Sequence, residues 1–104
     1  MDSNTAYSAG DHVLLLDVRE DDEWAAGRID GAVHIPLGEL PARVGELDQA
    51  RPIVAVCRSG GRAGKAAEVL GRAGLGAEVM TGGMTAWAEA GLPMTSPSGT
   101  PRVA

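Results

Sequence analysis

The only cysteine of this 104-residue chain lies in a segment that could activate a thiol. It follows a short apolar run and opens a sequence rich in glycine and arginine, Cys57-Arg58-Ser59-Gly60-Gly61-Arg62. The two glycines permit a tight turn in which successive amide N–H groups point at one spot and can bind an anion there. Because a helix N-terminus and neighbouring cations favour the thiolate, we expect Cys57 to be a nucleophile.

The residues around the cysteine suggest separate roles. We expect Arg58, at the rim, to meet a substrate anion, and Arg62 to point its donors into or behind the loop and fix its shape. Ser59 is expected to cap the following helix, and its hydroxyl could also contact a bound sulfur. Asp17 and Arg19, two positions apart at the end of an apolar run, are interpreted as a local pair that orders a loop and supports the site.

Composition narrows the class of protein. With 44% hydrophobic and 22% charged residues, the chain is expected to form one soluble domain. Its formal charge of -5 argues against a nucleic-acid partner, which usually requires a concentrated basic face. Four cations nevertheless gather at the cysteine segment and the helix after it, namely Arg58, Arg62, Lys65 and Arg72. This local positive charge suits a small anionic substrate.

Other sites and locations are disfavoured by the sequence. A lone cysteine forms no intrachain disulfide, and residues 1–5 lack the basic and apolar regions of a secretion signal, so a reduced thiol in the cytoplasm is expected. No apolar stretch approaches the ~20 residues that a membrane helix needs. His12 and His34 have no metal-ligand spacing with the cysteine, so we expect no metal. A monomer is the default expectation.

The hydrophobic pattern along the chain predicts strands and helices in alternation. Strands are predicted at 13–18, 32–35, 53–56 and 77–80, and helices near 20–26, 37–47, 62–72 and 84–90. This order predicts an α/β fold with a mostly parallel central sheet and helices on both faces, in which ligands bind beyond the carboxyl ends of the strands. Asp17 and Cys57 both fall there. We divide the chain into a polar segment 1–12, a domain 13–94 and a flexible tail 95–104.

Three blocks in the right order resemble the signatures of the rhodanese-like sulfurtransferases over about residues 13–94. The blocks are Leu16-Asp17-Val18-Arg19-Glu20 with the segment from Glu23 to Pro36, the loop from Cys57 to Arg62, and Gly82-Gly83-Met84-Thr85-Ala86-Trp87 with Ala90-Gly91-Leu92-Pro93. The resemblance implies a three-layer fold and a single-domain enzyme in which Cys57 takes up sulfur as a persulfide. It also implies thiosulfate or a similar anionic donor, a thiol or cyanide as acceptor, and no cofactor besides that covalent intermediate.

Two alternatives stay open beside this interpretation. Phosphatases of the same fold hold one more residue between cysteine and arginine than the four found here, so phosphatase or arsenate reductase chemistry is a minor alternative. A non-catalytic or protein-fed module, with a sulfur-relay protein as its partner, is the other. Two departures from the family are also apparent. Arg28 stands where histidine is common, and only about twelve residues precede the first strand, which leaves an edge strand of the sheet in question.

Overall fold

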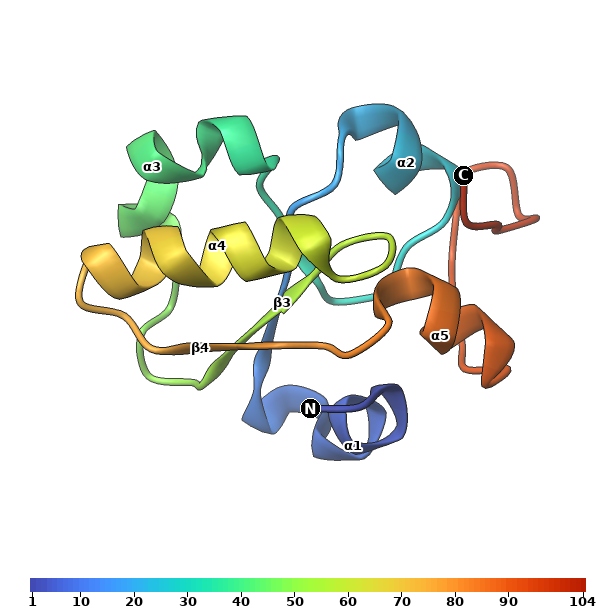
Figure 1. The fold of residues 1–104 in the computed structure, drawn as a ribbon. Coiled ribbons are helices and arrows are strands. Elements are labelled where there is room, and N and C mark those ends of the chain that lie inside the picture. The colour runs from blue at the N-terminus through green and yellow to red at the C-terminus, as the bar shows by residue number, and fades with distance from the viewer.

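The computed structural model describes residues 1–104 and has a parallel sheet between two layers of helices (Figure 1). The strands are β1 (Leu14–Asp17), β2 (Val33–His34), β3 (Ile53–Val56) and β4 (Ala77–Val79). Their order is β2-β1-β3-β4, and every neighbouring pair is parallel. Asp17 is paired with Val56 in the β1–β3 register, so the residues that follow both central strands emerge at the same edge. The predicted α/β class is confirmed.

Helices cover both faces of the sheet. They are α1 (Ser3–Ala9), α2 (Asp21–Ala26), α3 (Leu40–Arg43), α4 (Gly61–Arg72) and α5 (Gly83–Glu89), with short 3-10 turns at Gly10–His12, Leu37–Glu39 and Val44–Glu46. In Figure 1, α3 and α4 lie above the sheet, and α1 lies below it with α5 at its side. Each strand leads into a helical segment at its carboxyl end through a short loop, and the loops after β1 and β3 form the candidate site together with the start of α5.

Alternation along the central strands divides the core into two halves. Leu14, Leu16, Ile53 and Ala55 pack on the α4 side, with Ala63, Ala66 and Leu70 among their neighbours. Val54 and Val56 point to the other side, where Met84 and Trp87 of α5 and Ala6 of α1 pack. Since side chains alternate along a strand, Cys57 falls with Ala55 on the α4 side. The thiol therefore faces the helix that its own loop begins.

The helix predicted over residues 37–47 is divided into three short turns. A 3-10 turn leads into the single α-turn of α3, and a second 3-10 turn follows it. Pro41 lies in the first turn of α3, where its fixed φ is compatible with a helix. Gly38 and Gly45 lower the helical propensity on either side. Leu40 and Leu47 are buried, so the apolar spacing located the buried face but not the continuity of the helix.

The first twelve residues are structured. The Asp2 side chain accepts a hydrogen bond from Thr5 N at the start of α1, and Ala6 is buried against the α5 side of the core. The Met1 amino group donates to Val79 O at 3.1 Å, and Thr81 N donates to Met1 O at 2.8 Å. The chain start thus lies along the outer edge of β4, where two hydrogen bonds stand in place of a further strand.

The last ten residues run back along α2. Arg28 and Thr95 form an antiparallel bridge, with N···O distances of 2.9 and 2.8 Å, and Arg102 N donates to Ala26 O at 2.9 Å. The domain limits at residues 13 and 94 and the flexibility of the tail stay predictions. None of the helices combines the length and apolar character needed to cross a bilayer.

Candidate active site

Cys57 lies directly after β3 and begins the loop that leads into α4. The Gly60 amide donates to Cys57 Sγ at 2.9 Å, which places a hydrogen-bond donor on the sulfur. Gly60 has φ +126, a conformation that side-chain-bearing residues rarely adopt, so a glycine is needed for the turn. Of the several loop amides expected to surround the thiol, one, that of Gly60, donates a hydrogen bond to Sγ.

The cysteine is recessed below the loop. Cys57 is only 1% exposed and packs within the α4 half of the core, which contains Ala63 and Ala66 of α4. Burial by itself also suits an inert thiol. The amide contact and the two arginines of the loop are the features that distinguish this site, and a small reagent would have to approach Sγ through the loop.

The backbone of the loop is held by the first turn of α5. Met84 N donates to Cys57 O at 2.8 Å, and Thr85 N donates to Arg58 O at 3.0 Å. This approach depends on Gly83, which has φ +55 and whose Cβ, if present, would lie 2.6 Å from Arg58 O and overlap Cys57 O. Sequence reasoning did not give Gly83 this role, although the Gly82-Gly83 pair ahead of α5 was a visible signal.

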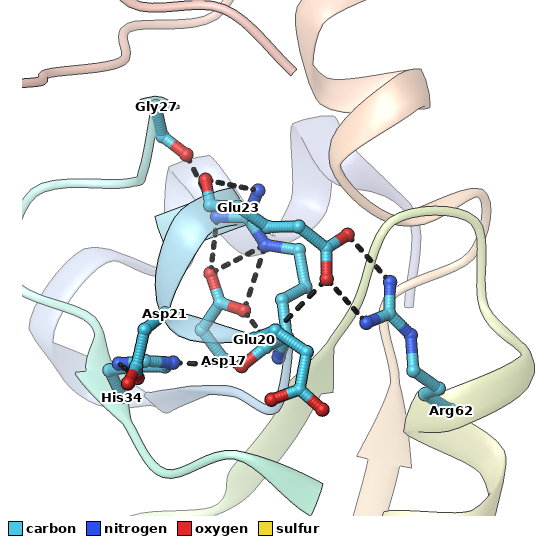
Figure 2. A network of polar contacts seen from close by, with 8 residues as sticks. Asp17, Glu20, Asp21, Glu23, Gly27, His34 and Arg62 are labelled. Atoms are coloured by element: carbon cyan, nitrogen blue, oxygen red, sulfur yellow. Dashed lines mark hydrogen bonds and ion pairs between the residues drawn. The ribbon is translucent and has the colours of Figure 1, made fainter. Parts of the chain in front are cut away.

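Asp17 and Arg19 are brought together as the sequence predicted. Arg19 Nη2 lies 2.7 Å from Asp17 Oδ2 and Nε lies 2.9 Å from Oδ1, with both side chains buried. The remaining donors of Arg19 reach Glu23 O at 3.2 Å and Gly27 O at 2.8 Å (Figure 2). Buried charges need such complete pairing, and here it fixes α2 to the end of β1.

Arg62 is bound on the α2 side of the loop and does not point into it. Its two terminal nitrogens both contact Glu23: Nη1 donates to Oε1, and Nη2 donates to Oε2 at 2.8 Å (Figure 2). These hydrogen bonds lower the pKa of Glu23 to about 2. Sequence reasoning missed Glu23, because the acidic run at 20–23 was explained by the helix dipole alone and its partner lies 39 positions away.

Arg58 and Ser59 are exposed residues of the loop. The Arg58 side chain makes no hydrogen bond or ion pair within the protein, so its charge is available to a ligand at the rim. The expectation that Ser59 caps α4 is wrong: the N-cap residue is Gly60, and no side chain caps this helix. Gly60 and Gly61 complete the turn, as expected for loop residues.

Arg28 is part of a stack beside this network. Its guanidinium lies 4.8 Å from the ring centre of Trp24, and Trp24 stacks on His34 with ring centres 4.6 Å apart. His34 Nε2 is 2.8 Å from Arg19 O. Arg28 therefore packs on Trp24 of α2.

A cavity between α1 and α5 lies away from the cysteine. It has a volume of about 220 Å³ and opens on the α1 and α5 side, between residues such as Tyr7, Leu15 and Trp87. No residue of the 57–62 loop lines it. No three side chains of histidine, cysteine, aspartate or glutamate lie close enough together to hold a metal ion. The groups that the site itself offers for chemistry are the Cys57 thiol, the Gly60 amide and the two arginines.

The fold and site define an α/β domain with a cysteine loop at the carboxyl end of a central parallel strand. The sequence matches the rhodanese-like domain family over residues 4–90. A sulfurtransferase of Allochromatium vinosum is 40% identical over 88 residues, which cover 84% of this chain and 82% of the relative. The putative sulfurtransferase YtwF of Bacillus subtilis is 40% identical over 79 residues, 76% of this chain and 77% of the relative.

Solved structures agree with this assignment. A rhodanese-related protein of Thermoplasma volcanium superimposes with a TM-score of 0.86 at 29% identity, over 91% of this chain and 95% of that one. A rhodanese-like domain protein of Staphylococcus aureus gives a TM-score of 0.81 at 30% identity, over 92% and 97% of the two chains. The chain belongs to the rhodanese-like sulfurtransferase family, so the resemblance of the three blocks is confirmed.

Proposed function

We propose that the protein transfers sulfane sulfur from thiosulfate or a similar anionic donor to a thiol or cyanide, through a persulfide on Cys57. The observation that supports this most directly is the Gly60 N–H···Sγ contact of 2.9 Å on the only cysteine of the chain. The sulfurtransferases among its relatives support the reaction class. The exposed, unpaired Arg58 supports an anionic donor.

The first half of the cycle loads the enzyme. The Cys57 thiolate attacks the outer sulfur of thiosulfate, a new S–S bond forms, the donor's S–S bond breaks, and sulfite leaves with the electron pair. Arg58 binds the anionic end of the donor, and the loop amide stabilises negative charge on the sulfur in a site with little water. Ser59 at the rim is placed to contact the donor as it enters.

The second half returns the free thiol. A thiolate or cyanide attacks the outer sulfur of the persulfide, and Cys57 leaves as a thiolate that the same amide stabilises. Electrons balance in both steps without an external oxidant or reductant. The cycle needs no metal and no cofactor besides the persulfide itself, and Asp17 and Arg19 support it only by fixing α2 beside the loop.

A protein-fed relay is the second candidate. The recessed position of Cys57 favours it, since a thiol that is only 1% exposed is poorly accessible to a free donor in solution. The putative sulfur carrier protein YrkF of Bacillus subtilis is 43% identical over 60 residues, although these cover only 58% of this chain and 32% of the relative. In this case a sulfur-relay partner protein supplies the persulfide and thiosulfate is a poor donor.

Thiocyanate formation from thiosulfate and cyanide tests the proposal. We expect turnover by the wild-type protein and none by Cys57→Ser, and we expect no hydrolysis of a phosphate monoester by either. Absence of thiocyanate from the folded, reduced wild-type protein would reject thiosulfate as donor. Sulfur uptake from a persulfidated protein under the same conditions would then favour the relay.

A further inference from the structure

We propose that Glu23 is a positioning residue of the Cys57 loop, which holds the Arg62 guanidinium beside the loop and leaves Arg58 as the cation that binds the donor. Glu23 lies on α2 and does not contact Sγ, so it acts through Arg62. The kinetic part of this inference rests on the proposed sulfur transfer. The part that concerns the reactivity of the thiol does not.

The Glu23–Arg62 pair is unlike the surface ion pairs of this protein. Glu23 is 14% exposed and Arg62 is 34% exposed, whereas the carboxylates that pair with Arg43 and Arg51 on the surface are more than half exposed. Like the Arg43–Glu46 pair it is bidentate, but only the Glu23–Arg62 pair joins two helices, α2 and the first turn of α4, across 39 positions of sequence. A paired planar fork of this kind fixes direction as well as distance.

Glu23 is itself held in place from two sides. Its Oε1 accepts the Glu20 N–H at 3.1 Å, and its carbonyl oxygen accepts from Arg19 Nη1 at 3.2 Å. Arg19 is anchored by the buried carboxylate of Asp17 at the end of β1. Figure 2 shows these contacts as one continuous network from the central sheet to Arg62. The orientation of Arg62 is therefore set by the rigid sheet and not by the loop alone.

Electrostatics explain why Arg62 needs this partner. A cation in the first turn of α4 lies at the positive end of the helix dipole, which disfavours it. The Glu23 hydrogen bonds are the largest cause of a raised Arg62 pKa, and the charges of Glu23 and Cys57 add to it. Without Glu23 the Arg62 side chain would be free to turn toward any bound anion.

This arrangement divides the work between the two arginines. Both terminal nitrogens of Arg62 are occupied by Glu23, while Arg58 is exposed and has no partner. Loss of Glu23 should therefore slow the reaction step, which depends on the geometry of the loop, more than it weakens binding of the donor, which depends on Arg58. For Glu23→Gln we expect kcat with thiosulfate to fall about 10-fold while KM changes less than about twofold, since small misplacements of a positioned group cost rate in this range.

The test compares Glu23→Gln with Glu46→Gln, which breaks a surface pair with Arg43 that lies outside the site. Steady-state kinetics with thiosulfate and cyanide give kcat and KM, and iodoacetamide modification of the single thiol, followed by mass, gives the pH profile of its reactivity. We expect Glu23→Gln to lower kcat and to shift that profile, and Glu46→Gln to do neither. Wild-type values for Glu23→Gln in both measurements would overturn the proposal.

Two further variants keep the test decisive. Arg62→Lys replaces Glu23→Gln as the test if Glu23→Gln folds poorly. It retains the positive charge but cannot bind both carboxylate oxygens of Glu23 in the same planar way, so we expect the same lower kcat and shifted alkylation profile. The exchange Glu23→Arg with Arg62→Glu restores opposite charges at the two positions, and we expect it to leave kcat low. Recovery of kcat would mean that the pair only ties two helices together. Wild-type protein inactive on thiosulfate would reject the proposed function, whereas the alkylation profiles would still decide the role of Glu23.

Discussion

At the scale of single residues, the two arginines of the loop differ in what already binds them. Arg62 has both terminal nitrogens on Glu23, and Arg58 projects from the loop without a partner. An unpaired surface guanidinium retains its capacity for a bidentate contact with an anion. The two arginines therefore have different roles. Arg62, paired with Glu23, fixes the geometry of the loop, and the unpaired Arg58 is available to bind the donor.

The role of Arg58 gives a prediction for donor binding. We expect Arg58→Ala to raise the KM for thiosulfate about fivefold or more and to change the free energy of unfolding by less than about 0.5 kcal/mol, because the exposed side chain makes no hydrogen bond or ion pair in the folded protein. Steady-state kinetics and urea unfolding measure the two effects. Arg72→Ala removes the same charge from the last turn of α4 and serves as the control. An equal rise in KM for both variants would mean that only the overall charge matters.

Residues close in sequence were predicted better than pairs far apart in it. The pairing of Asp17 with Arg19 and the position of Cys57 after a strand follow from spacing and apolar runs. The Glu23–Arg62 pair does not, because a long-range ion pair depends on how α2 and α4 come together. The cap at Gly60 was also missed, since a serine at 59 satisfies the usual capping preference and only the backbone conformation shows otherwise.

At the scale of elements, the start of α5 is part of the loop. Its first amides bind the carbonyl oxygens of Cys57 and Arg58, and only a glycine at 83 allows this distance. Helix α5 is therefore required for the shape of the cysteine loop although it contributes no side chain to the sulfur.

Alanine at position 83 should damage both stability and activity. The new Cβ would overlap the loop carbonyls at a positive φ, so we expect Gly83→Ala to cost more than about 1 kcal/mol of unfolding free energy and most of the sulfur transfer. Gly71→Ala in α4 meets open space at an ordinary helical position and should stabilise the protein by about 0.5–1 kcal/mol. Thermal melts and thiocyanate assays compare the two. Wild-type activity in Gly83→Ala would contradict this account of the loop.

The elements themselves were predicted unevenly. All four strands were predicted from the sequence. The central strands β1 and β3 are buried and mostly apolar, as expected of parallel strands covered on both faces, whereas the edge strands β2 and β4 contain His34 and Glu78 and are less buried. Helix α1 was missed, since Ser3 to Ala9 contains a single buried apolar residue, Ala6, and gives almost no periodic signal. The position of α1 depends on packing against α5 and on the hydrogen bonds of Met1 to the end of β4. Such tertiary contacts produce no local sequence pattern from which a helix can be predicted.

At the scale of the whole molecule, the Glu23–Arg62 pair makes stability depend on pH. The pKa of Glu23 falls from an ordinary 4.5 to about 2 in the folded protein. Because the folded pKa is the lower one, the pair's contribution is fully present above about pH 4.5 and is lost as the pH falls through about 2. Acid therefore releases the contact between α2 and α4 before it affects the apolar core.

Unfolding at several pH values measures this contribution. We expect wild-type protein to be more stable than Glu23→Gln at about pH 6, and the difference to shrink steadily between about pH 4.5 and pH 2 as the native carboxylate takes up a proton. Urea unfolding followed by circular dichroism gives the two curves. A difference that stays constant over this range would show that ionisation of Glu23 does not contribute to the free energy of unfolding.

The central claim is that Cys57 carries sulfur, and intact mass spectrometry tests it most directly. Reduced wild-type protein is incubated with thiosulfate, desalted and weighed, and then treated with cyanide and weighed again, beside Cys57→Ser as the matched control. We predict that wild-type protein gains one sulfur atom, loses it to cyanide, and that the serine variant gains none while remaining folded. No gain of mass by folded, reduced wild-type protein, or an equal gain by Cys57→Ser, would contradict the account.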